Sequence, residues 1–241
     1  LHKAIRRQRQ MCIRDRVYLP FIGYLLSNEN ERKISPVHLI SFLTQKVILV
    51  AIYEKWENVT ASKAAIRLGV TKMSANRCFD EIEYLNVDIL GMKGKSRVIT
   101  VPADIQKLWN DVRVILRNPV IARYELKEDI QLGKKAGITA LCEYSLLSDN
   151  EYPTYAITKK EITESGIRKM KQVHSGEEIG CVVLELGYFI DFKNKKLEDP
   201  LSVTLSLTES EKQDERIGIS IKRMLELSLI HISEPTRLRC I

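Results

Sequence analysis

Two short helices joined by a tight turn are predicted in the first half of the chain. Thr60 is a good N-cap for a helix over residues 61–68, and Gly69 suits its end because glycine takes left-handed backbone conformations without strain. Thr71 then caps a second helix over residues 72–85. Apolar side chains recur along that second helix at helical spacing, which predicts a buried face of Ala75, Cys78, Phe79, Ile82 and Leu85. The pattern is typical of a helix-turn-helix.

A β-hairpin with a basic tip is predicted directly after these helices. Two β-prone runs, 89–92 and 97–101, flank the turn Lys93-Gly94-Lys95-Ser96. Upstream, residues 36–56 are apolar on almost every side, which indicates a central buried helix rather than a surface one. Three helices followed by a hairpin is the order of a winged helix-turn-helix.

Both ends of the chain differ in character from the part between them. The strings MCIRDR (11–16) and SLIHISEPTRLR (228–239) resemble translated sequencing-adapter read-through. We therefore expect residues 1–17 and 228–241 to be foreign to the fold and leave them out of the fold prediction. The alternative is a genuine basic N-terminal arm that binds a phosphate backbone.

The positive charge of the remaining chain is concentrated in one stretch. The 241 residues have a formal net charge of +7. Six basic and one acidic side chain fall in 1–17, and two basic and one acidic in 228–241, which leaves +1 for 18–227. Residues 60–101 alone hold seven basic and four acidic side chains, a net charge of +3. An anionic partner, in particular nucleic acid, is expected there.

The predicted contacts to DNA lie on the two helices and the hairpin. The start of the second helix is expected in the major groove, where Asn76 or Arg77 can read an adenine or guanine edge. Basic residues around it are expected to hold phosphates, which set affinity rather than sequence choice. The full predicted set is Lys63, Thr71, Lys72, Ser74, Asn76, Arg77, Lys93, Lys95 and Arg97.

The fold class expected for the whole chain is α+β, with a winged helix-turn-helix followed by a smaller mixed domain. Helix and strand patterns alternate after residue 118 without internal repeats. The expected domains are 18–101 for DNA binding, a linker helix over 102–118 that starts at Pro102, and an α+β domain over 119–227 for regulation or dimerisation. Within it we expect strands near 120–124, 154–158 and 181–190 and helices near 134–147 and 214–227.

Two segments of the first domain resemble bacterial winged-helix transcriptional regulators of the MarR-like kind. They are AAIRLGVTKMSANRCFDEIEYL (64–85) and GMKGKSRVITV (91–101). Three later segments are similar to the second domain of such proteins: KKAGITALCEYSLL, EYPTYAIT and DPLSVTLSL. More distantly, Ala140-Leu141 and the strand after them resemble antitoxins of abortive-infection type IV systems, which repress their own promoter. In the first family VYLPFIG (17–23) follows a further N-terminal segment, so the resemblance implies a truncated domain there.

Sites for chemistry are scarce in the sequence. No G-x-S-x-G or phosphate-binding loop is present, and His38 and His174 lack a metal-ligand partner at helical spacing. The one enzyme candidate is a metal-dependent nuclease, in which Asp191, Lys193 and Glu185 would act at a strand end; an ordinary solvated turn is the alternative. Four tyrosines could line an effector pocket or belong to the core: Tyr144, Tyr152, Tyr155 and Tyr188.

These observations predict a cytoplasmic bacterial transcriptional regulator without enzyme activity, cofactor or metal. Its expected partner is double-stranded DNA, bound by a homodimer, with a toxin protein or a small-molecule effector as a further partner of the second domain. No membrane association is expected, because the longest apolar runs, 47–53 and 181–190, are too short to span a bilayer. Cys78, Cys142 and Cys181 are widely spaced, which favours reduced structural thiols. The rival functions are an antitoxin and the nuclease.

Overall fold

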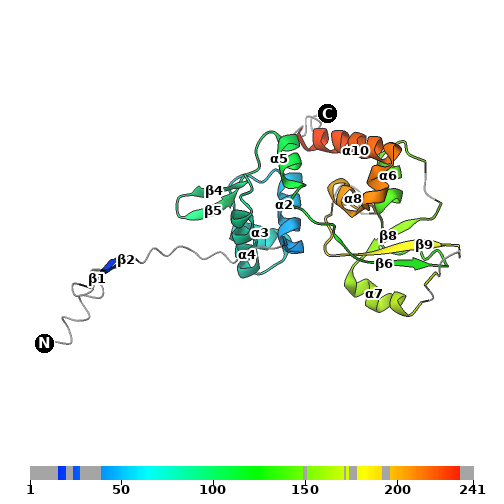
Figure 1. The fold of residues 1–241 in the computed structure, drawn as a ribbon, viewed down its shortest axis with the longest axis horizontal. Helices are drawn as coiled ribbons and strands as arrows, with labels where there is room; N and C mark the ends of the chain where they lie inside the picture. The colour runs from blue at the N-terminus through cyan, green and yellow to red at the C-terminus, as the bar shows by residue number, and fades with distance from the viewer. Residues whose placement is uncertain are drawn as a thin grey trace, which may run out of the picture. The chain divides into compact units, whose positions relative to one another are not determined.

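The computed structural model describes residues 16–19, 24–27, 39–148, 151–170, 172–173, 178–191 and 196–233. Residues 1–35 and 36–241 form separate compact units. In the first unit, strands β1 (Arg16–Leu19) and β2 (Tyr24–Ser27) pair antiparallel. The second unit mixes helices with two sheets, which confirms the expected α+β class (Figure 1). We call its residues 39–116 the N-terminal lobe and residues 117–233 the C-terminal lobe.

Helix α2 (Phe42–Glu54) is buried on most of its surface. Ser41 caps its start, because the Ser41 Oγ accepts a hydrogen bond of 3.2 Å from the Thr44 backbone N–H. Lys55 ends it in a left-handed conformation with φ of 47°. The helix is therefore shorter than the predicted 36–56, of which residues 36–38 lie outside the described residues.

The next two helices confirm the predicted pair and its turn. Helix α3 (Ala61–Leu68) is capped by Thr60, and Gly69 follows it in the left-handed conformation with φ of 66°. Helix α4 (Lys72–Tyr84) is capped by Thr71, whose Oγ accepts a hydrogen bond of 3.1 Å from the Ser74 N–H. The predicted buried face is present, except that Leu85 lies just beyond the helix and is only half-buried.

A three-stranded antiparallel sheet completes this part of the N-terminal lobe. Strands β4 (Leu90–Lys93) and β5 (Ser96–Ile99) form the predicted hairpin, with Lys93 opposite Ser96. Gly94 has φ of 62°, a conformation that the tight turn requires and that glycine adopts readily. The short strand β3 (Val59–Thr60) joins the free side of β5, so that the order is β3-β5-β4.

Helix α5 (Ile105–Val112) occupies part of the predicted linker helix but begins later. Pro102 does not start it; Asp104 is the cap, and its carboxylate accepts a hydrogen bond of 2.9 Å from the Lys107 N–H. The predicted start at Pro102 is therefore wrong, because the helix begins at Ile105. Ile105, Leu108, Trp109 and Val112 form the buried face of α5 in the core of the N-terminal lobe.

A four-stranded sheet forms the centre of the C-terminal lobe (Figure 1). Its order is β6 (Val120–Leu126), β9 (Cys181–Leu186), β8 (Thr154–Ile157) and β7 (Lys134–Lys135). Strands β8 and β9 are parallel, and the other two pairs are antiparallel. Strand β9 is buried along its whole length, as expected for a strand covered on both faces.

Each face of this sheet packs against different helices. Alternating β9 side chains divide between two core clusters, with Cys181 and Val183 on one face and Val182 and Leu184 on the other. The first face is covered by helix α7 (Lys159–Ser165) and the short turn of helix η1 (Ile167–Lys169). On the opposite side Figure 1 shows helices α6 (Gly137–Tyr144), α8 (Pro200–Ser206) and α10 (Glu215–Ser233).

The elements of the C-terminal lobe differ in length from the predicted ones. Strand β9 ends at Leu186 instead of Ile190, helix α6 is shorter than 134–147, and helix α10 extends past Leu227. Helices α7, α8 and α9 (Glu209–Gln213) were not predicted, although their starts carry readable signals. Thr158 and Thr208 each form a capping box with the glutamate three residues on, and Asp199-Pro200 is a cap followed by proline at the first helical position.

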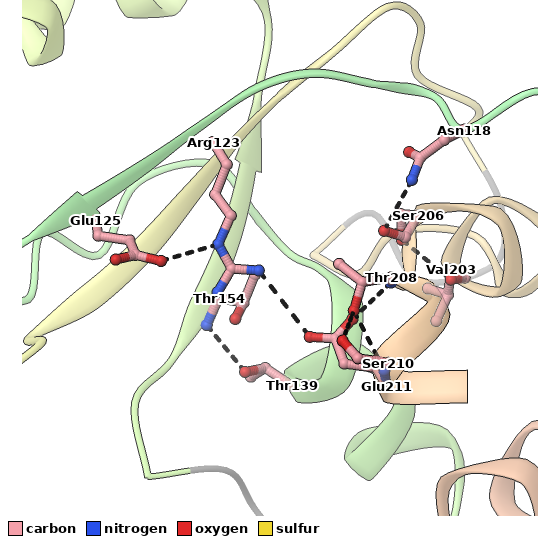
Figure 2. Close-up of polar contacts among 10 residues, drawn as sticks. All are labelled: Asn118, Arg123, Glu125, Thr139, Thr154, Val203, Ser206, Thr208, Ser210 and Glu211. Carbon is pink, nitrogen blue, oxygen red and sulfur yellow. Dashed lines mark hydrogen bonds and ion pairs between the residues drawn. The ribbon is translucent and has the colours of Figure 1, made fainter. Parts of the chain in front are cut away.

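Polar contacts fasten the helices of this lobe to its sheet, as Figure 2 shows. The Arg123 guanidinium of β6 lies between the carboxylates of Glu125, at 3.2 Å, and Glu211 of α9, at 4.0 Å. In the same lobe the Thr154 N–H of β8 donates a buried hydrogen bond of 2.9 Å to the Thr139 Oγ of α6. These contacts connect α9 to β6 and α6 to β8.

A buried polar network joins the two lobes. The Tyr53 hydroxyl of α2 donates a hydrogen bond of 2.7 Å to Asp199, and accepts one of 2.9 Å from the Leu201 N–H. Close by, the Tyr188 hydroxyl accepts hydrogen bonds from Gln45 Nε2 of α2, at 2.9 Å, and from the Ser202 hydroxyl of α8, at 3.1 Å. Helix α2 is thus connected to the C-terminal lobe by hydrogen bonds of buried and half-buried side chains.

We expect Tyr53→Phe to destabilise the protein by about 1–3 kcal/mol, because it leaves Asp199 and the Leu201 N–H short of a buried hydrogen-bond partner. The free energy of unfolding, measured by urea titration, checks this. The matched control is Tyr84→Phe on α4, whose side chain is exposed and whose loss is expected to stay within about 0.5 kcal/mol. Equal effects of the two substitutions would contradict the role given to the network.

Candidate nucleic-acid interface

The nine residues predicted to contact DNA all lie on α3, α4, their caps and the β4–β5 hairpin. Six of them are exposed and two, Ser74 and Asn76, are half-buried. The caps place them, because Thr71 fixes the first turn of α4 and Gly94 fixes the tip of the hairpin. The exposed six are Lys63, Thr71, Lys72, Arg77, Lys93 and Lys95.

Helix α4 turns its apolar face to the core and its polar face outward. Phe79 and Ile82 are fully buried, while Lys72 and Arg77 are exposed near the start of the helix. The Ser74 hydroxyl lies 2.9 Å from the Thr71 hydroxyl, and the Arg77 guanidinium lies 4.0 Å from the Met73 sulfur. Local contacts therefore order the polar side chains of the first two turns.

Arg97 is placed differently from the other predicted residues. Its side chain is only 12% exposed, and its Nη1 lies 2.6 Å from Asp80 and 2.7 Å from Glu83. The guanidinium carbon also lies 6.0 Å from the centre of the Phe79 ring. The predicted role of Arg97 in holding phosphate does not fit this placement, because its charge is already paired. Arg97 instead anchors the hairpin to α4.

The other five cations of the predicted set differ from Arg97 in their surroundings. In the part of the chain that the structure describes, no carboxylate forms an ion pair with Lys63, Lys72, Arg77, Lys93 or Lys95. Arg67 on α3, by contrast, pairs with Glu54 of α2. The acids further along α4 are also occupied, since Glu81 accepts a hydrogen bond of 3.0 Å from the Ser41 N–H. This surface therefore presents positive charge to solvent.

Comparisons with known protein families, with curated proteins and with solved structures find no match to this chain.

Among the described residues, no helix is both long enough and apolar enough to cross a membrane.

The side chains of the predicted nuclease site are engaged elsewhere. Glu185 is buried and accepts hydrogen bonds from Arg168, at 3.2 Å, and from the Tyr124 hydroxyl, at 3.3 Å. Asp191 forms an ion pair of 3.1 Å with Lys134, and Lys193 lies outside the described residues. Within the described part of the chain, no group of three His, Cys, Asp or Glu side chains is arranged to hold a metal ion.

The other candidate residues do not converge on one site. Tyr188, Tyr155, Tyr144 and Tyr152 belong to four different core clusters, so they do not line a common effector pocket. His38 and His174 lie outside the described residues. Burial raises the pKa of the Cys78 and Cys181 thiols, which makes both poor nucleophiles at neutral pH.

Sequence reasoning missed a pair of buried acids at the start of α8. Glu198 and Asp199 are each 2% exposed. Glu198 accepts hydrogen bonds from the Gly137 N–H, at 3.2 Å, and from the Ser206 hydroxyl, at 3.3 Å, through one oxygen, while its Oε1 has no partner among the described residues. Burial, and then the charge of Asp199, raise the pKa of Glu198 to about 8.

We expect Gly69→Ala to destabilise the turn between α3 and α4. Gly69 has φ of 66° and a Cβ there would touch nothing within 4 Å, so the cost, about 1 kcal/mol, is that of the left-handed backbone alone. The control is Gly91→Ala in β4, where the space is equally open and φ is not positive. Thermal unfolding of both variants checks this, and a Gly69→Ala variant no less stable than Gly91→Ala would contradict it.

We expect stability to fall as pH rises between about 4.5 and about 8 through Glu198. The unfolded carboxyl loses its proton near 4.5 and the folded one near 8, so the folded state holds more protons in this window and deprotonation favours unfolding. Asp199, whose pKa burial also raises, adds to the same trend. In the Glu198→Gln variant, the free energy of unfolding, measured by urea titration, should decline less steeply across this range. The difference in slope should be on the order of 1 kcal/mol per pH unit.

The control for this measurement is Glu226→Gln on α10, an exposed glutamate whose removal should leave the decline unchanged. A Glu198→Gln variant that loses stability with pH in parallel with the unsubstituted protein would contradict the assignment.

Proposed function

We propose that this chain is a sequence-specific DNA-binding regulator and that residues 42–101 act as a winged helix-turn-helix. The observation that carries the proposal is the set of exposed cations on α4 and the hairpin that have no ion-pair partner among the described residues, while Arg67 and Arg97 are paired. Three further features support it: the cap-defined turn between α3 and α4, the antiparallel hairpin that follows, and the net positive charge of residues 60–101.

In this proposal the start of α4 enters the major groove. Lys72, Ser74, Asn76 and Arg77 lie in its first two turns, where recognition helices contact base edges. Arg77 suits the O6 and N7 acceptors of guanine, and Asn76 suits the N6 and N7 groups of adenine. The sequence preference of the protein then depends on these two side chains.

The phosphate contacts come from the periphery of the same surface. Lys63 of α3 and Lys93 and Lys95 of the hairpin hold the backbone, and the Thr71 hydroxyl lies at the helix start, where anions are favoured. Arg97 contributes indirectly: by pairing with Asp80 and Glu83 it offsets one of their two negative charges and so weakens their repulsion of phosphate.

We further propose that the protein acts as a cytoplasmic homodimer on a palindromic site, as helix-turn-helix proteins usually do. The C-terminal lobe then supplies dimerisation or binds a regulatory partner, and a toxin protein in that place would make the chain an antitoxin. The buried network of Tyr53, Asp199, Gln45 and Tyr188 supports a role in regulation, since it connects that lobe directly to α2.

We expect the protein to select preferred duplexes from a library with a randomised core, and to bind them with an affinity that falls steeply with salt. Fluorescence anisotropy of the full chain measures both. The six basic residues before Val17 are replaced by glutamine throughout, so that residues 1–17 add no phosphate binding of their own. Lys72→Ala/Arg77→Ala should bind the selected duplex about tenfold or more weakly and lose the preference over random DNA.

The matched control is Lys222→Ala/Arg223→Ala on α10, which removes one exposed lysine and one exposed arginine from another helix. It should retain the preference for the selected duplex. Failure of the library to yield any preferred duplex, or equal losses in the two double variants, would overturn the proposal and direct attention to a protein partner.

A further inference from the structure

A cavity of about 540 Å³ lies between α2 and the segment that follows β9. Residues 189–191 form one side and residues 66–69, at the end of α3, form another. The α2 side consists of Lys46, Val50, Tyr53 and Glu54. The volume is that of a small-molecule site, and the cavity uses none of the residues assigned to DNA.

Most charges in the cavity are neutralised by partners within the protein. Arg67 pairs with Glu54, and Asp191 pairs with Lys134 at 3.1 Å. Lys46 differs, because it makes no ion pair with any described residue although its side chain is half-buried. Burial lowers the pKa of Lys46, and the nearby charge of Asp191 partly opposes this shift. Lys46 is therefore the one cation of the cavity lining without an ion-pair partner among the described residues, and its ammonium is partly desolvated.

The rest of the lining includes several apolar side chains, although the surface that the cavity exposes is more polar than apolar. Val50 of α2 and Ile190 are buried, and Phe189 packs against the sheet of the C-terminal lobe. Leu68 adds a half-buried aliphatic side chain from α3. A ligand with a short hydrocarbon body would thus remove a small apolar surface from water, and its polar head group would supply the main interaction.

We propose that this cavity binds a small organic anion, with one carboxylate or phosphate group beside Lys46 and an apolar body against Val50, Phe189 and Ile190. A cationic ligand is disfavoured, because Glu54 and Asp191 already have cationic partners. A neutral apolar ligand would desolvate Lys46 further without giving its charge a partner, which costs free energy. This inference does not depend on DNA binding.

Isothermal titration calorimetry with four probes of equal chain length tests the charge preference on the full chain. Octanoate and octyl phosphate carry the two anionic head groups, octanol is neutral and octylammonium is cationic. At least one of the two anions should bind about tenfold or more tightly than octanol and octylammonium, and which one binds identifies the head group. Equal binding of all four probes, or no binding of either anion, would overturn the proposal.

Substitution of Lys46 tests the position of the head group. Lys46→Met should weaken binding of the preferred anion about tenfold or more, while Lys46→Arg keeps the charge and most of the affinity. The control is Lys107→Met, an exposed lysine on α5 away from the cavity lining. Lys46→Met and Lys107→Met variants that bind the anion equally would overturn the proposal. The comparison of probes on the unsubstituted protein decides the question even where Lys46→Met fails to fold.

Discussion

Helix α2 can be buried only when both lobes close around it, and the arrangement of residues 39–233 follows from that need. Its apolar residues pack into one core with α4 and α5, and this core also contains Tyr188, Leu201 and Leu205 of the C-terminal lobe. Gln45 and Tyr53 put polar atoms on the same buried helix, and an unpaired polar atom there would cost free energy. Their partners come from the segment after β9 and from α8. The two lobes therefore stabilise each other.

Pairing of charges divides the cations of the N-terminal lobe into two groups. Arg67 and Arg97 form ion pairs with carboxylates of neighbouring elements. These ion pairs hold α3 to α2 and the hairpin to α4. The lysines of the hairpin tip and the first turns of α4 have no such partners among the described residues. Arg97 offsets one of the two negative charges of Asp80 and Glu83, so the acids on α4 only partly reduce the surrounding positive charge. A surface that attracts anions remains.

Local signals in the sequence were enough to predict the helix pair, the turn and the hairpin. Thr60, Gly69 and Thr71 act on their own neighbours, so their effect can be read without knowledge of the fold. The role of Arg97 could not be read in this way, because it depends on which residues of α4 the hairpin reaches. Glu198 and Asp199 look like ordinary surface acids in the sequence, and only the packing of α8 against α2 and α6 buries them. Lys46 likewise gained significance only through the cavity around it.

In the proposed function, α4 reads bases in the major groove through Asn76 and Arg77. The most direct measurement replaces each purine of a selected duplex, one at a time, by its 7-deaza analogue, which lacks the N7 acceptor of the major groove. The proposal predicts that affinity falls by about tenfold at a few purines and that the losses at guanines disappear in the Lys72→Ala/Arg77→Ala protein. Unchanged affinity at every position would contradict base reading by α4 and leave only binding to the phosphate backbone.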